Sequence, residues 1–299
     1  MVTQKNIKLV KKTAAKSAEK DKDKKTKAED KKKMITDTAK STENQMINLK
    51  INDKEILVEK GITVLEAARR NNIHIPSLCY LEDLCVAGIC RVCVVEIEGE
   101  KNLKTACTYI VDKPIKILTS SEKVRKARRF VLELMLANHY GQCYSCFRNL
   151  NCELQKLAKE YGIETLRFGQ ATTPRYKVDN SSYSVIRDKD KCILCKRCIR
   201  TCVDLQQVGV LEAANRGIDC EVQTFYDKPL AEVVCINCGQ CINRCPTAAL
   251  RANDPTNEVW EAIDDPEKIV IIQTAPSPRA AIGEEFGLPA GTSVTKKLN

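Results

Sequence analysis

The chain has 299 residues, a formal net charge of +10 and 17 cysteines. Many of these cysteines are separated by two intervening residues, a spacing that suits a shared metal centre better than a disulfide framework. The N-terminus lacks the apolar core of a secretory signal, and no apolar run approaches the roughly 18 residues of a membrane span. We therefore expect a cytoplasmic chain with no membrane span, whose thiols stay reduced and available to a metal.

Residues 1–45 supply most of the net charge. They contain 14 Lys and 7 acidic residues, which leaves about +3 for the rest of the chain. Metal clusters with thiolate ligands are themselves anionic, so the basic surplus does not indicate a nucleic-acid partner. The segment holds too few apolar residues to offset the entropy of ordering, which predicts a disordered Lys-rich tail. A transit peptide is the alternative, but such peptides are rich in Arg and this segment has none.

Residues 46–120 have the pattern of a small α+β domain. Alternating apolar residues on both sides of Asn52 predict a β-hairpin. Thr63 and Glu66 have the spacing of a capping box in front of an amphipathic helix. A loop that carries cysteines follows this helix, and short returning strands complete the domain.

Residues 121–165 are expected to form two helices that flank further cysteines. The first helix is expected over 121–138 and the second over 153–161. The residues expected on the apolar face of the first helix are Val124, Ala127, Val131, Leu134 and Met135. The segment 165–190 is polar and irregular, which is typical of a surface linker.

Residues 166–255 contain an internal repeat, in which four cysteines recur with the same spacing of two, two and three residues. A bacterial ferredoxin run has this spacing, and its fourth cysteine ligates the other cluster. The spacing predicts one 4Fe–4S cluster on Cys192, Cys195, Cys198 and Cys245. It predicts a second 4Fe–4S cluster on Cys202, Cys235, Cys238 and Cys241. Zinc also binds paired cysteines, but the doubled run and Pro246 fit four-iron clusters better.

The candidate ligands of a 2Fe–2S cluster in the first domain are Cys79, Cys90, Cys93 and Cys107. Two cysteines lie two residues apart, one lies upstream and one follows the next strand. The first loop is longer than in plant-type ferredoxins, which have four residues between their first two cysteines. Cys85 lies inside this loop and is a rival ligand, but choosing it would leave Cys79 unexplained. A structural zinc site is the alternative for this group.

A third group combines His139 with Cys143, Cys146 and Cys152. The three cysteines lack a fourth, and His139 is the nearby residue able to complete a third 4Fe–4S cluster. A neutral imidazole in place of a thiolate tends to raise the potential of such a cluster. The alternative is that His139 only ends the preceding helix. His74 has no cysteine in register, and Cys85 and Cys220 remain as spare thiols.

The order of these four groups resembles the N-terminal iron–sulfur relay of iron-only (FeFe) hydrogenases. The resemblance covers residues 46–299 and rests on segments such as Gly88-Ile-Cys90-Arg-Val-Cys93 and His139-Tyr-Gly-Gln-Cys143. The same module opens the large iron–sulfur subunit of NADH dehydrogenase and several NAD-dependent formate dehydrogenases. The resemblance implies a β-grasp fold for the first domain and places the ligands on the fifteen cysteines and His139 named above.

Within the C-terminal segment 256–299, residues 268–287 resemble the first strand and helix of the hydrogenase catalytic domain. No cysteine follows Cys245, so the ligands of the hydrogen-forming cluster are absent from this sequence. We expect a short βα segment that docks on a partner. The sequence also has no glycine-rich dinucleotide fingerprint and no P-loop.

The sequence therefore predicts an electron-transfer subunit without a catalytic site of its own. The resemblance implies a multi-subunit NAD(P)-linked hydrogenase or formate dehydrogenase complex. This class of complex includes electron-bifurcating enzymes. The expected partners are a flavin- and NAD(P)-binding iron–sulfur subunit, a catalytic hydrogenase or formate dehydrogenase subunit, and ferredoxin. The alternative is a truncated fragment of a catalytic FeFe hydrogenase.

Overall fold

The computed structural model describes residues 46–169, 174–273 and 275–294, so the predicted tail lies outside the described residues. The strands are β1 (Met46–Ile51), β2 (Lys54–Glu59), β3 (Val94–Ile97), β4 (Lys104–Thr105), β5 (Lys116–Leu118), β6 (Val185–Arg187), β7 (Glu212–Ala214), β8 (Glu221–Gln223) and β9 (Leu250–Ala252). The α-helices are α2 (Val64–Arg70), α3 (Glu122–Ala137), α4 (Glu153–Glu160), α5 (Arg197–Arg200), α6 (Gln240–Arg244), α7 (Thr256–Asp264) and α8 (Pro276–Glu285). A π-helical segment, Thr201–Leu205, continues α5.

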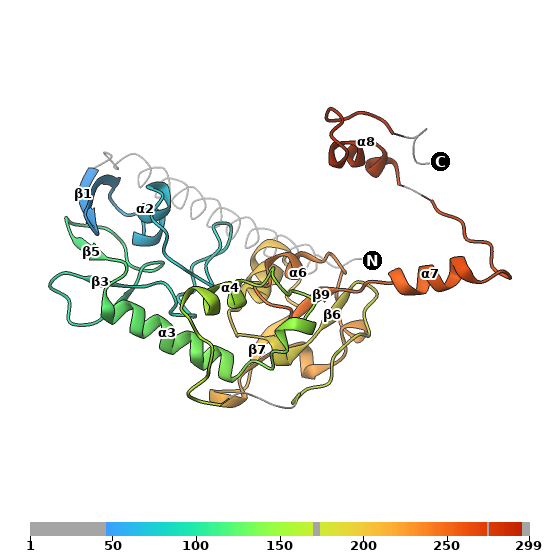
Figure 1. The fold of residues 1–299 in the computed structure, drawn as a ribbon, viewed down its shortest axis with the longest axis horizontal. Coiled ribbons are helices and arrows are strands. Elements are labelled where there is room, and N and C mark those ends of the chain that lie inside the picture. Colours follow the sequence, from blue (N-terminus) through green and yellow to red (C-terminus); the bar gives the residue numbers. More distant parts are fainter. Residues whose placement is uncertain (1–45, 170–173, 274, 295–299) are drawn as a thin grey trace, which may run out of the picture.

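A five-stranded mixed sheet forms the N-terminal part of the molecule, with strand order β2-β1-β5-β3-β4 (Figure 1). β1 and β2 form the predicted hairpin, in which Ile47 lies opposite Val58 and Leu49 lies opposite Ile56. These four side chains are buried because alternate residues of a strand point to the same face. β5 then pairs parallel to β1 and antiparallel to β3, which brings the end of the domain back to its start.

Helix α2 covers the buried face of this sheet. Its N-cap is Thr63, whose side chain accepts a hydrogen bond from the backbone N–H of Glu66 at 3.2 Å. This bond satisfies one of the free N–H groups of the first turn, as the capping pattern predicted. Val64 and Leu65 are fully buried against the sheet.

Helix α3 leads from the sheet towards the cysteine-rich part of the molecule (Figure 1). The face predicted for it is partly wrong, because Leu132 is buried whereas Leu134 is 45% exposed. Two charged residues, Arg128 and Glu133, also point inward. Each finds polar partners there: Arg128 donates to the Val94 carbonyl, and two guanidinium groups donate to Glu133. Because these hydrogen bonds let two charged side chains be buried, the buried face of α3 differs from the apolar face that the sequence predicted.

Strand β6 corrects the prediction of a polar surface linker over 165–190. It pairs antiparallel with β9, so that Ile186 lies opposite Arg251. Val185 is buried, and the carboxylate of Asp190 is buried as well. The backbone N–H groups of residues 175 and 176 donate to that carboxylate. A three-residue strand whose partner lies more than sixty residues away leaves no local periodic signal.

The two copies of the cysteine repeat fold alike. In the first copy, Leu194 and Lys196 have positive φ angles of 55° and 56°. In the second, Asn237 and Gly239 occupy the equivalent positions with φ angles of 54° and 68°. A short helix follows in each copy, α5 and α6 respectively. The left-handed residues on either side of the second cysteine turn the chain around a central space.

The C-terminal segment leaves the body of the molecule through α7 and reaches α8 by an extended stretch (Figure 1). The strand expected in the predicted βα segment is absent from the described residues 265–273, whereas the helix is present as α8. Ile269, Ile271 and Ile272 are 91%, 85% and 80% exposed. A strand needs a neighbouring strand to pair its backbone, and these residues have none among the described part of the chain.

Candidate iron–sulfur sites

The four cysteines predicted for the two-iron cluster lie together in the first domain. Cys79, Cys90, Cys93 and Cys107 are all buried. The Sγ atoms of Cys93 and Cys107 are 3.4 Å apart, and Cys79 shares hydrogen bonds with Cys107 and Cys90. The fold produces this arrangement because β3 begins directly after Cys93, and Cys107 follows the paired strand β4.

Hydrogen bonds among these thiols divide their pKa values. Bonds from Cys107 and Cys90 hold the pKa of Cys79 far below its ordinary value. The same bonds raise the pKa values of Cys90 and Cys107. The hydrogen bond with Cys107 lowers the pKa of Cys93 as well, to about 7, so two of the four thiols have lowered pKa values and two have raised ones. Bound iron would remove the remaining protons, because a metal ion stabilises a coordinating thiolate.

Cys85 lies apart from this group. Its thiol is exposed and donates to Oδ2 of Asp204 at 3.0 Å, a bond that raises its pKa. His74 is exposed as well. The structure thus brings Cys79 to the other three cysteines and directs Cys85 towards another module.

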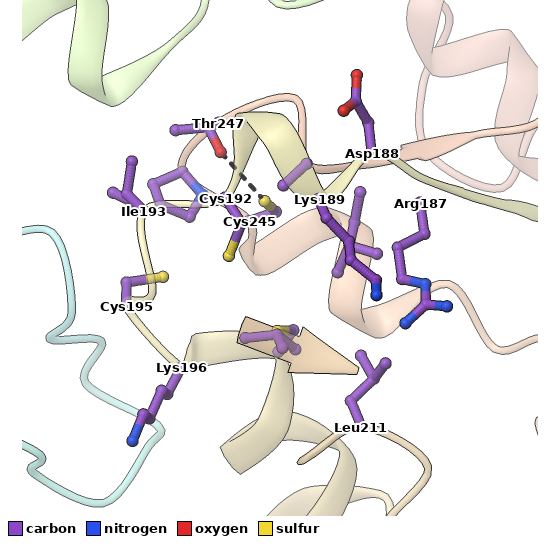
Figure 2. A pocket seen from close by; sticks show the side chains of 15 residues that line it. Arg187, Asp188, Lys189, Cys192, Ile193, Cys195, Lys196, Leu211, Cys245 and Thr247 are labelled. Atoms are coloured by element: carbon purple, nitrogen blue, oxygen red, sulfur yellow. Dashed lines mark hydrogen bonds between the residues drawn. The ribbon is translucent and has the colours of Figure 1, made fainter. Parts of the chain in front are cut away.

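Four cysteines from the two repeat copies line one apolar cavity. These are Cys192, Cys195, Cys198 and Cys245. The cavity has a volume of about 460 Å³, including its opening to solvent. Figure 2 shows the labelled side chains of Cys192, Cys195 and Cys245 around the same space. We call this cavity site A.

A second cavity is lined by the complementary set, Cys202, Cys235, Cys238 and Cys241. Its volume is about 490 Å³, again including the opening to solvent, and we call it site B. Each site therefore combines three cysteines from one copy with the last cysteine of the other copy. This is the crossed grouping that the sequence predicted.

Burial raises the pKa values of several cysteines in the two sites. It raises the pKa of Cys192 to about 12 and that of Cys195 to about 11. In site B, burial raises the pKa of Cys241 to about 12. A thiolate in such surroundings needs a nearby positive charge, which a cluster's iron ions would supply. Four thiols around one apolar cavity are a donor set that fits an iron–sulfur cluster.

The third group is less compact. Cys143 is exposed, whereas Cys146 and Cys152 are half-buried. The charges of Cys143 and Cys146 both act to raise the pKa of Cys152, although burial has the largest effect. The Sγ atom of Cys152 also lies 3.6 Å from the carbonyl oxygen of Pro246, next to site A.

His139 is buried at the end of α3, and its Nδ1 atom has no hydrogen-bond partner. Burial, and then the charge of Lys191, lower its pKa, so the ring stays neutral. The backbone of Lys191 accepts a hydrogen bond from the ring. A metal-bound histidine commonly has this arrangement, with one ring nitrogen held by a backbone carbonyl and the other free for the metal. The charged residues that act on the pKa of the ring are Lys191 and Asp188, and Cys143, Cys146 and Cys152 are not among them. Within the described ranges, no three His, Cys, Asp or Glu side chains converge as they would around a single metal ion.

Three family models match successive parts of the chain. Residues 44–122 match a 2Fe–2S iron–sulfur cluster binding domain. Residues 128–167 match the iron–sulfur binding region of NADH-ubiquinone oxidoreductase G. Residues 183–251 match the ferredoxin-like domain of NADH-quinone oxidoreductase subunit 3. The chain therefore carries successive iron–sulfur domains of the kind found in NADH dehydrogenases.

The chain is also similar to subunits of curated oxidoreductases. It is 45% identical over 258 residues to the NADP-reducing hydrogenase subunit HndD of Solidesulfovibrio fructosivorans, covering 85% of this chain and 44% of the relative. It is 36% identical over 205 residues to the NADPH-Fe(3+) oxidoreductase subunit alpha of Geobacter sulfurreducens, covering 69% of this chain and 24% of the relative. The chain thus spans less than half the length of these relatives.

A solved structure has a similar fold. The crystal structure of an NAD+-reducing [NiFe]-hydrogenase in the H2-reduced state matches with a TM-score of 0.64 and 27% identity. The match covers 69% of this chain and 87% of the hydrogenase chain. No helix in the described part of this chain is long and apolar enough to cross a membrane.

Arg197 connects the candidate sites through hydrogen bonds, a role that was not predicted from the sequence. Its guanidinium donates to both carboxylate oxygens of Glu153, at 2.6 and 3.0 Å. It also donates to the carbonyl oxygens of Tyr80 and Arg244, at 3.3 and 3.5 Å. Each of these residues is the sequence neighbour of a candidate ligand: Arg197 precedes Cys198, Tyr80 follows Cys79, Glu153 follows Cys152 and Arg244 precedes Cys245.

A signal for this role was visible in the sequence. The first copy of the repeat has Arg197 and Arg200 where the second has Gln240 and Asn243. A charged side chain beside a buried cysteine is unusual unless it has partners inside the protein. The difference between the two copies therefore marked the first as the one packed against other modules.

Proposed function

We propose that this chain is an electron-relay subunit that holds one 2Fe–2S cluster and three 4Fe–4S clusters. The observation that carries the proposal is the crossed arrangement of sites A and B, each a cavity lined by four cysteines from two sequence copies. Iron–sulfur clusters supply one-electron transfer, and the protein supplies their position, hydrogen bonds and solvent exposure.

The residues proposed to hold the clusters follow the groups described above. Cys79, Cys90, Cys93 and Cys107 would hold the two-iron cluster, and sites A and B one four-iron cluster each. Cys143, Cys146 and Cys152 would hold the third four-iron cluster, with His139 as its fourth ligand. The unpaired, buried Nδ1 atom of His139 supports this role, because a buried polar atom without a partner is costly.

The packing of the modules supports a relay centred on site A. Cys79 and Cys195 belong to one buried cluster of side chains. Cys152 reaches the carbonyl of Pro246 on the other side, and Cys198 lies in a buried cluster with the half-buried Cys241 of site B. Site A thus has a neighbour from each of the other three groups, which suits a junction through which electrons pass.

We further propose that the complete assembly is an NAD(P)-linked hydrogenase or formate dehydrogenase. Its partners would be a flavin- and NAD(P)-binding iron–sulfur subunit, a catalytic subunit, and ferredoxin. The relatives named NADP-reducing hydrogenase subunit and NADPH-Fe(3+) oxidoreductase subunit support this class of assembly. A truncated fragment of a catalytic FeFe hydrogenase is the second candidate, and the similarity to a relative named as a hydrogenase subunit is compatible with it.

The test is iron analysis of protein purified without oxygen, together with titration by a chemical reductant. We expect about 14 iron ions per chain, the sum for one two-iron and three four-iron clusters. Dithionite should reduce the clusters, whereas NADH should not do so until the flavin-binding partner is added. Half this iron after full reconstitution, or stoichiometric zinc, would contradict the four-cluster proposal.

His139 provides a separate test of the third cluster. His139→Cys should keep four irons there and lower the midpoint potential, because a thiolate replaces a neutral ligand. His139→Ala should leave one iron open and produce a three-iron signal in electron paramagnetic resonance (EPR). An unchanged four-iron spectrum and potential in His139→Ala would show that another group completes the cluster.

A further inference from the structure

Arg200 is a buried guanidinium between two candidate cluster sites. It ends α5 and has a relative exposure of 8%. Its Nη2 atom donates to the carbonyl oxygen of Cys79 at 2.5 Å and lies 3.5 Å from that of Cys195. Nη1 donates to the carbonyl of Cys85. One side chain therefore contacts the backbone of a candidate two-iron ligand and of a candidate site A ligand.

The charge of Arg200 lacks a carboxylate partner. None of the ion pairs among the described residues includes Arg200, whereas the neighbouring Arg197 is paired with Glu153. Its hydrogen-bond partners include the carbonyl oxygens of Cys79, Cys85, Cys195 and Lys196, and it also interacts with the thiol of Cys85. A buried charge without a counter-charge is strongly unfavourable. Negative charge is therefore expected close to Arg200.

The nearby groups that can supply this charge are the ligand cysteines on either side. Cys79 and Cys195 share a buried cluster of side chains with Cys90. Clusters bound by thiolates carry net negative charge, so each of the two sites would face Arg200 with an anion. Asp204 lies near as well, but its Oδ2 atom accepts the thiol of Cys85.

We propose that Arg200 is a positioning residue that acts as the shared counter-charge of the two-iron centre and of site A, and that it raises the reduction potential of both. The proposal rests on the cluster assignment made above. Reduction adds one electron, and thus one negative charge, to a centre. A fixed positive charge stabilises the reduced form more than the oxidised form, which raises the potential.

The test compares neutral and charged replacements of Arg200 in the full chain. Midpoint potentials are measured by EPR during titration with dithionite, which supplies the electrons. The signals are assigned by their loss in Cys90→Ala and in Cys195→Ala. Arg200→Met and Arg200→Gln should both shift the two assigned potentials to more negative values. Arg200→Lys keeps the charge, so its potentials should stay near those of the native protein.

Arg128 provides a matched control. It is also a buried arginine, and it donates to the carbonyl of Val94 and not to that of a candidate ligand. Arg128→Met should leave the potential of the Cys195 centre unchanged. If Arg200→Met fails to assemble, Arg200→Gln, which keeps hydrogen-bond donors, carries the same comparison.

Two results would overturn the proposal. The first is a neutral Arg200 variant with full iron content and both potentials unshifted. The second is an Arg200→Lys variant whose potentials fall as far as those of Arg200→Met. Either outcome leaves the cluster assignment standing, because that assignment fails only if the native chain lacks the iron and the assigned signals.

Discussion

The two copies of the cysteine repeat share a backbone path but differ in their surroundings. In the first copy, Cys195 and Cys198 are buried at 6% and 8% exposure, and two arginines reach into neighbouring modules. In the second copy, Cys238 is exposed, and Ile236 beside it is 57% exposed. The same local fold thus produces an interior site and a surface site.

This difference indicates that the cysteine spacing determines how a cluster would be held. The residues between the cysteines determine whether the site lies in the interior or at the surface. In the proposed relay, a cluster at the interior site A would exchange electrons with other centres of the same chain. A surface site such as B has a side that faces solvent, through which an external donor or acceptor can approach. Potential also depends on solvent exposure, so two clusters of one type would differ in potential.

The largest expected effect comes from testing the crossed ligation. Cys192→Ala and Cys245→Ala should each remove about four iron ions, and the double variant should remove no more, because both residues belong to site A. Cys192→Ala combined with Cys202→Ala should remove about eight, because both sites are then opened. Iron analysis after anaerobic reconstitution measures this. The reverse pattern would mean that each copy keeps its own fourth cysteine.

A smaller effect is expected at the equivalent positions 197 and 240. Arg197→Ala removes a guanidinium that is buried at 3% exposure, and Glu153 loses its partner. Because the Glu153 side chain is 44% exposed and regains water, we expect a loss of about 2 kcal/mol in unfolding free energy. Gln240→Ala loses one hydrogen bond from Arg244 and should cost about 0.5–1 kcal/mol. Anaerobic denaturant unfolding followed by circular dichroism measures both, and equal losses would contradict the comparison.

The smallest effect concerns the left-handed residue after the second cysteine of each copy. Gly239 has φ +68° with nothing within 4 Å of an added Cβ, so Gly239→Ala should cost about 1 kcal/mol through backbone strain alone. Lys196 already bears that strain, and Lys196→Gly should gain at most about 1 kcal/mol. The same unfolding measurement applies. Changes of the same sign in both variants would show that the two turns are not equivalent.

Local sequence patterns predicted the parts of the fold that local forces determine. The β1–β2 hairpin followed from alternation, and the start of α2 from its capping residues. The cysteine spacing predicted the grouping seen in sites A and B. What escaped prediction depends on distant partners: β6 is a strand because β9 pairs with it, and Arg128 is buried because a carbonyl of β3 accepts from it. The ligand roles of the cysteines and of His139, and the domain boundaries, stay predictions.

The crossed grouping of the cysteines has a consequence for biosynthesis. Site A lacks its fourth cysteine until Cys245 has left the ribosome, roughly 50 residues after Cys192 and about 3–10 s later at typical rates of synthesis. Site B, which needs Cys202 from the first copy, gains its last three cysteines in that same interval. Under the proposed ligation, neither copy alone has the complete ligand set of a four-iron cluster. The pair would then be the smallest unit that holds a complete site, and loss of either copy would leave both sites incomplete.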